Sequence, residues 1–157
     1  MRSLNEITMG VASEVLTRFI RECHAQNEHK RIVQVIDQLV DMFSNPSNPL
    51  HVKNGGLIGL AGTAIALGTD VAPYMDKFIE PLLMCFSDPE NRIRYFSAEC
   101  LYNIAKVSKG EILVYFNPIF DALSKASGPL FSMTSRSEPR IALCRFGAVC
   151  QEWRGAS

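Results

Sequence analysis

The stretch NGGLIGLAGTAIALG, residues 54–68, contains no charged side chain, and five of its fifteen residues are glycine. A phosphate-binding loop of the Walker A type needs a lysine directly after its last glycine, and the next lysine is Lys77. The Rossmann pattern of glycines is absent as well. Charges at Lys53 and Asp70 close the stretch, which makes it shorter than the roughly 20 apolar residues of a membrane span. A buried helix remains as the prediction.

Helical spacing sorts this stretch into three apolar faces, and we expect a helix over residues 51–67 that is buried on all sides. Each interior glycine costs about 1 kcal/mol of helix propensity, a cost that is tolerable where a bare face lets a neighbouring helix come close. The first face is small (Gly55, Gly59, Gly62, Ala66), the second is larger (Leu57, Leu60, Ala64, Leu67), and the third carries Ile58 and Ile65.

Apolar residues recur at helical spacing along much of the rest of the chain, and no segment alternates with period two. The pattern predicts helices over residues 4–20, 32–43, 71–86, 89–107 and 111–126. Pro89 suits a first turn, Pro81 is expected to kink its helix, and Pro118 is a second internal proline. The expected core faces are Leu4, Ile7, Val11, Val15, Phe19 and Ile20; then Ile32, Val35, Ile36, Leu39, Val40 and Phe43; then Tyr74, Phe78, Leu82 and Phe86.

Six helices joined by short connectors form three pairs with a period near 40 residues. This is typical of a HEAT/armadillo-like α-solenoid, so the fold class is all-α. We expect residues 1–126 to form the helical repeats and residues 127–157 to be a divergent, flexible tail. The final pair should then expose Ile119 and Leu123.

The composition is balanced, because 16 basic residues face 16 acidic ones. A neutral chain has no overall attraction to nucleic acid or anionic lipid. The five cysteines are an odd number without a C-x-x-C pair, and the amino terminus has no apolar core of signal-peptide length. These features predict free thiols and an intracellular protein.

Sequence motifs give no support for an enzyme, a cofactor site or a metal site. There is no G-x-S-x-G and no H-E-x-x-H. Cys23, His24 and His29 are close in sequence but lack a second pair of ligands, so we expect them to be surface residues. The cluster EHKR at 28–31 is a weak candidate for contact with an anionic membrane.

A repeat signature lies in SDPENRIRYFSAECLYNIAKV, residues 87–107, which resembles a HEAT repeat. Ser87 or Asp88 can cap the helix, Arg94 can bridge to the adjacent repeat, and Ala98 is small where two helices cross. The sequence of residues 4–125, most strongly that of residues 53–125, is similar to one family. It resembles the amino-terminal HEAT region of the vacuole-morphology scaffold, a subunit of the phosphatidylinositol 3-phosphate 5-kinase complex.

The resemblance implies a non-catalytic platform that supports synthesis of phosphatidylinositol 3,5-bisphosphate. In that family the scaffold holds the lipid kinase and an opposing lipid phosphatase on endosomal and vacuolar membranes, so membrane association is expected to be peripheral and through partners. Family members are several times longer, and their carboxy-terminal part supports self-association, which we expect this chain to lack. From Ala126 onward the chain departs from the family pattern, which continues with another acidic D-P turn.

We expect the partner surface at the solenoid edge near Asp88, Arg92 and Arg94. Tyr95 and Tyr102, seven residues apart, can share an outward edge beside it. The alternative is an armadillo-type adaptor for extended peptides in trafficking. Such an adaptor needs asparagines at regular spacing on its inner helices, and Asn103 alone does not form such a ladder.

Overall fold

The structure, a computed structural model, describes the backbone of residues 4–126 and the side chains of residues 11–125. All regular elements in this range are helices, so the all-α prediction is confirmed. The α-helices are α1 (Leu4–Ala25), α2 (His29–Ser44), α3 (Leu50–Leu67), α4 (Met75–Met84), α5 (Asn91–Ser108) and α6 (Phe116–Ala126). Three 3₁₀ segments connect them: η1 (Gly68–Tyr74), η2 (Cys85–Ser87) and η3 (Lys109–Tyr115). The predicted tail over residues 127–157 lies outside the described residues.

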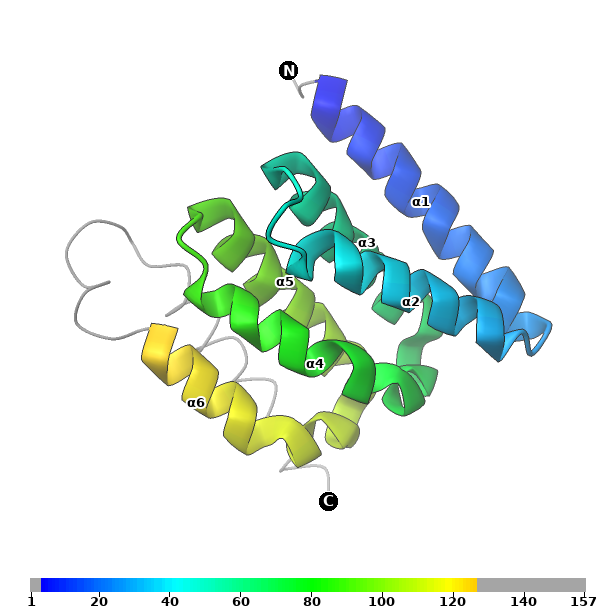
Figure 1. The fold of residues 1–157 in the computed structure, drawn as a ribbon. Coiled ribbons are helices and arrows are strands. Elements are labelled where there is room, and N and C mark those ends of the chain that lie inside the picture. The colour runs from blue at the N-terminus through cyan, green and yellow to red at the C-terminus, as the bar shows by residue number, and fades with distance from the viewer. Residues whose placement is uncertain (1–3, 127–157) are drawn as a thin grey trace.

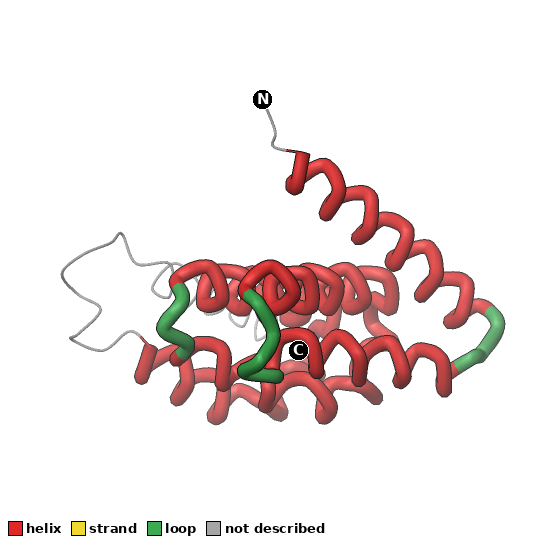
Figure 2. Tube along the Cα trace, turned by 45° about the horizontal axis from the view of Figure 1, so that its top comes forward, coloured by secondary structure: helices red, strands yellow, loops and turns green. Residues whose placement is uncertain are grey.

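The helices stack in two layers as three antiparallel pairs (Figure 1). One layer holds α3 between α1 and α5, and the other holds α4 between α2 and α6. Figure 2 shows that α1 diverges from the stack toward its amino-terminal end. The predicted α-solenoid of three helix pairs is therefore confirmed, with its first helix splayed.

The glycine-rich helix α3 is approached closely by two neighbours. A Cβ atom added at Gly56 would lie 2.8 Å from the carbonyl oxygen of Leu39 in α2. A Cβ atom added at Gly62 would lie 3.1 Å from the Ser13 hydroxyl oxygen in α1. The prediction of a helix buried on all sides is wrong on one face, because Ile65 is 45% exposed.

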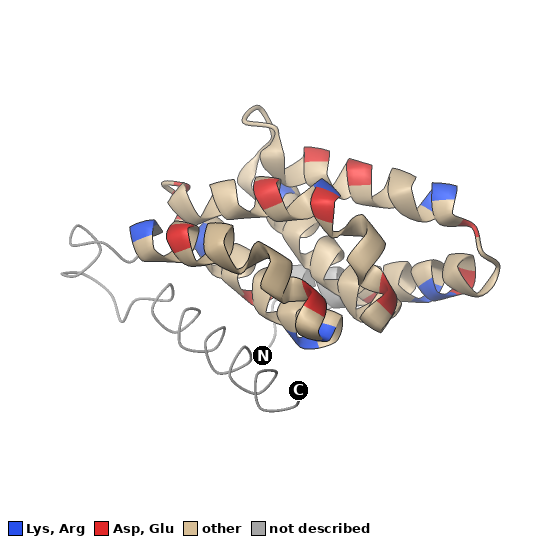
Figure 3. Cartoon of the chain, turned by 90° about the horizontal axis from the view of Figure 1, so that it is seen from below, with Lys and Arg blue, Asp and Glu red and all other residues tan. Residues whose placement is uncertain are grey.

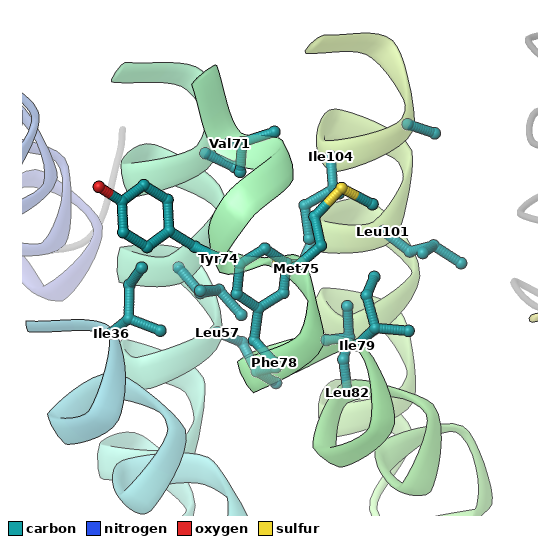
Figure 4. Packing of buried hydrophobic residues seen from close by; sticks show 14 of the residues in the cluster. Ile36, Leu57, Val71, Tyr74, Met75, Phe78, Ile79, Leu82, Leu101 and Ile104 are labelled. Atoms are coloured by element: carbon teal, nitrogen blue, oxygen red, sulfur yellow. The ribbon is translucent and has the colours of Figure 1, made fainter. Parts of the chain in front are cut away.

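The core fills the space between the layers. Figure 4 shows Met75 and Phe78 of α4 lying between α3 and α5, whereas Tyr74 of η1 points away from α5, with its hydroxyl near His29 of α2. The predicted faces over α2 and over η1, α4 and η2 lie in the core, where Ile32, Ile36, Leu39, Phe43, Tyr74, Phe78, Leu82 and Phe86 are buried. Val35 and Val40 of the predicted α2 face are half-buried against the core.

The helical run over residues 50–87 is apolar enough to pass as a membrane span, with a mean hydropathy of 1.4 in its most apolar window. Half of that window is buried inside the described helices. Such burial is typical of a core helix in a packed helical domain.

Two predicted helices begin differently from expectation, because their first turns are 3₁₀. The segment expected at 71–86 runs as η1, α4 and η2, and α4 continues through Pro81 for three residues. Pro118 lies in the first turn of α6, where a missing N–H group costs little. Both 3₁₀ segments begin at a residue with positive φ, which is 58° at Gly68 and 53° at Lys109.

Two apolar surfaces differ from the prediction. In the expected core face of α1, Val11, Val15 and Phe19 are 57%, 62% and 39% exposed, whereas Ile20 is buried. Leu4 and Ile7 lie outside the described side chains. The splay of α1 explains the exposure of Val11 and Val15, because its amino-terminal half leaves the stack. Ile119 and Leu123 are fully buried, so the expectation that they are exposed is wrong. They pack into the core cluster, on a helix that contacts α4 and η2.

A tyrosine at the end of each long 3₁₀ segment bonds to the first turn of the preceding pair's second helix. The hydroxyl of Tyr74 is 2.8 Å from Nδ1 of His29, the first residue of α2. The hydroxyl of Tyr115 donates to a carboxylate oxygen of Asp76, the second residue of α4. Tyr74 and Tyr115 are 41 positions apart, so these "tyrosine ties" follow the repeat.

Candidate partner-binding site

The turn between η2 and α5 is closed by hydrogen bonds within itself. The Asp88 carboxylate accepts from the backbone N–H of Glu90 at 2.9 Å. The Arg94 guanidinium donates to the carbonyl oxygens of Asp88 and Pro89 at 2.6 and 2.8 Å, and to Asn91 Oδ1 at 3.0 Å. The turn is therefore a preformed feature of the solenoid edge.

These bonds change the roles predicted for two residues. Glu90, rather than Ser87 or Asp88, directly precedes the helix, and no side chain caps it. The prediction that Ser87 or Asp88 caps the helix is wrong. The Asp88 carboxylate accepts from the Glu90 N–H inside the turn, before the helix begins at Asn91. The sequence predicts that Arg94 bridges to the adjacent repeat. In the structure it donates to the turn that precedes its helix, a contact the prediction did not include.

The outer face of α5 carries the other predicted partner residues. Arg92 and Tyr95 are exposed, the latter by 40%, and Tyr102 is half-buried. Positions 92, 95 and 102 share one side of the helix, as expected from their spacing. The Tyr95 ring packs edge-on against the half-buried Phe96 ring, with centroids 5.4 Å apart. We call Arg92, Tyr95 and Tyr102 the "α5 face".

A groove beside the turn was missed by the sequence reasoning. It is a hollow of about 450 Å³ between the end of α2, the start of α3 and the end of α4. Asp88 belongs to its lining, together with Lys53, Glu80 and Met84. Met84 is 74% exposed, and its position out of phase with the buried α4 face was the available signal.

Cys85, which lines the groove, has a thiol of low reactivity. The pKa of the Cys85 thiol is raised to about 11, mainly by burial; the hydrogen bond with Ser97 and the charge of Lys53 lower it, and the charge of Asp88 raises it. Burial also raises the pKa of Cys100. A protonated, buried thiol is a poor nucleophile and a poor metal ligand.

The cluster of Cys23, His24 and His29 is structural. Cys23 is buried, so the expectation of a surface residue is wrong for it. His24 Nε2 lies 3.0 Å from Asp70 Oδ2, and His29 contributes to a tyrosine tie. Within the described residues there is no group of three side chains that could hold a metal ion.

Charges on the described surface are mixed. Figure 3 shows acidic and basic residues interspersed along the helices on the face seen from below. In the EHKR cluster, Arg31 pairs with Glu28 at 3.1 Å, which neutralises part of its positive charge. The Asn103 amide donates to the carbonyl oxygen of Glu99 in its own helix at 2.9 Å. That bond uses a donor which an armadillo-type ladder would present to a peptide.

Comparison with known proteins places half of the chain in one family. A family model described as "Vacuolar 14 Fab1-binding region" matches residues 51–130, from the start of α3 past the end of α6. Vacuole morphology and inheritance protein 14 of Saccharomyces cerevisiae is 44% identical over 71% of this chain and 13% of its own length.

Two further relatives are named VAC14 homologs. The protein of Arabidopsis thaliana is 40% identical over 71% of this chain and 15% of its own length. The protein of Schizosaccharomyces pombe is 44% identical over 70% of this chain and 14% of its own length. The matched part of the chain thus spans about one seventh of each curated relative. No solved structure matches the chain.

Proposed function

Because the chain belongs to the Vac14 family, in its Fab1-binding region, we propose that it is a non-catalytic scaffold unit that binds a Fab1-type lipid kinase. The resemblance inferred from residues 53–125 is confirmed by the family match. One observation carries the proposal: the family model is named for Fab1 binding, and the residues it matches form α3 to α6 with the turn and the α5 face.

The binding surface in this proposal is the α5 face together with the turn at Asp88. The turn is held because Arg94 donates to two of its carbonyl oxygens and to the Asn91 side chain at the start of α5, so a partner meets a preformed shape. Tyr95 and Arg92 are of the residue types that dominate binding energy at protein interfaces. Arg92 makes no ion pair with any described residue, which leaves its guanidinium for a carboxylate on the partner.

The wider role follows from the family resemblance and is part of the same proposal. The chain supports synthesis of phosphatidylinositol 3,5-bisphosphate from phosphatidylinositol 3-phosphate by positioning the kinase. The opposing lipid phosphatase is a second partner. In this proposal the chain lies on the cytoplasmic side of endosomal and vacuolar membranes, and it associates with them through these partners.

A pull-down of the full chain with the Fab1-type kinase and, separately, with the phosphatase tests the proposal. We expect capture of the kinase, and we expect Arg92→Glu to weaken it without lowering the melting temperature, since an exposed charge contributes about 0–1 kcal/mol to the fold. Arg18→Glu on α1 is the matched control, because Arg18 is exposed and lies outside the family match. Capture of neither enzyme by the folded chain would refute the function.

A further inference from the structure

The groove beside the Asp88 turn combines apolar walls with charged side chains that make no ion pair within the described structure. Phe43 and Pro81 contribute apolar walls, and the flexible side chain of Met84 stands exposed at the rim. Thioether side chains adapt their shape to varied apolar ligands, so an exposed methionine suits a binding surface. A volume of about 450 Å³ is within the range that small ligands and peptide side chains occupy.

Two carboxylates and one ammonium group line this groove. Neither Glu80 nor Asp88 makes an ion pair with any described residue. Lys53 lies 41 positions before Arg94 and therefore occupies the equivalent place in the preceding repeat. Arg94 is used by its own turn, whereas Lys53 has no ion pair in the described part of the chain. The excess charge of the groove is negative.

We propose that this groove binds an extended segment of a partner protein in which a bulky apolar side chain stands next to a lysine or arginine. The apolar side chain enters between Phe43, Pro81 and Met84, and the basic side chain pairs with Glu80 and Asp88. Lys53 donates to a carbonyl group of the same segment. The inference deepens the proposed function, because most of the groove lies within the Fab1-binding match.

The probe is a set of short overlapping peptides that cover the Fab1-type kinase, titrated against the full chain by fluorescence anisotropy. A synthetic peptide with one leucine–arginine pair among small polar residues is included, and so is the same peptide with alanine for leucine and glutamine for arginine. We expect the best binders to contain a basic residue beside a large apolar one. Binding that ignores this pair overturns the proposal.

Two variants with matched controls locate the binding. We expect Met84→Asp and Glu80→Lys each to weaken peptide binding by about tenfold, because one removes the apolar contact and the other reverses a partner charge. Val114→Asp is the control for the first, since Val114 is 78% exposed on η3, and Asp121→Lys on α6 is the control for the second. Both controls should leave affinity within about twofold. Equal losses in controls and variants would overturn the assignment to the groove.

The kinase pull-down separates this inference from the proposed function. If Met84→Asp and Glu80→Lys still capture the kinase as well as the parent chain, the groove proposal fails and the function stands. If the parent chain captures no kinase but binds the leucine–arginine peptide through Met84, the groove stands and the function fails. If the chain dimerises through Met84 and no peptide competes, the occupant is a second copy and the proposal is refuted.

Discussion

The neighbouring glycines Gly55 and Gly56 of α3 should respond in opposite directions to the same added methyl group. A Cβ atom at Gly55 meets the Met42 Cε atom at 3.5 Å, an ordinary van der Waals distance. A Cβ atom at Gly56 lies 2.8 Å from both the Leu39 carbonyl oxygen and Met42 Cβ. The first position has room, whereas the second requires the backbone of α2 to move.

The magnitudes follow from propensity and packing. Replacing an interior helical glycine by alanine stabilises a helix by about 1 kcal/mol. Gly55 also lines an apolar hollow of about 120 Å³ between α1, α2 and α3, which a methyl group partly fills. Gly55→Ala should therefore raise the free energy of unfolding by about 0.5–1 kcal/mol. Overpacking costs about 1–3 kcal/mol, so Gly56→Ala should lower it by about 1–2 kcal/mol.

Urea unfolding followed by circular dichroism measures both values. For a chain of 157 residues, each kcal/mol corresponds to about 3 °C in melting temperature, so a thermal melt gives a second reading. A Gly56→Ala variant as stable as Gly55→Ala would refute the close approach of α2 to α3.

Three further variants test other contacts. Gly59→Leu should lower the free energy of unfolding by about 1–3 kcal/mol, because an added Cβ already lies 2.6 Å from Leu39 Cδ2; a melt equal to the parent's would contradict this. Lys109→Gly should raise it by about 1 kcal/mol by relieving the positive φ of 53°, and an unchanged urea midpoint would count against the strain. The hydrogen bond to Asp76 raises the pKa of Tyr115 from 10.0 to about 12. The folded state therefore keeps the phenol proton to a higher pH than the unfolded state does, and the free energy of unfolding should fall as the pH rises from about 10 to about 12. Tyr115→Phe should make this fall shallower, and an unchanged slope would exclude the contact.

The apolar period predicted the α2 and α4 faces because those faces meet the core along their whole length. It did not reveal η1 and η3, since seven residues at three per turn place apolar groups much as an α-helix does. It also assigned Val11 and Val15 to a core face, although no neighbouring helix covers them in the described structure. A period identifies a face, whereas the direction of a whole helix decides whether that face is buried.

The candidate site was predictable in part for a similar reason. The exposure of Arg92 and Tyr95 follows from their phase on α5, which spacing alone determines. The bonds of Arg94 depend on the path of the turn, and the groove at Met84 depends on how three helix ends meet. Neither of these is encoded in the spacing of one helix.

The tyrosine ties join successive helix pairs at the edge where the chain does not pass from one pair to the next. On the edge that carries η1 and η3, Tyr74 and Tyr115 hydrogen-bond the second and third helix pairs to the pair before each. On the opposite edge, the chain itself crosses from one pair to the next, through residues 45–49 between α2 and α3 and through residues 88–90 between η2 and α5. Successive pairs are therefore held together at both edges, by the backbone at the edge that carries the groove and by a side-chain hydrogen bond at the edge of η1 and η3.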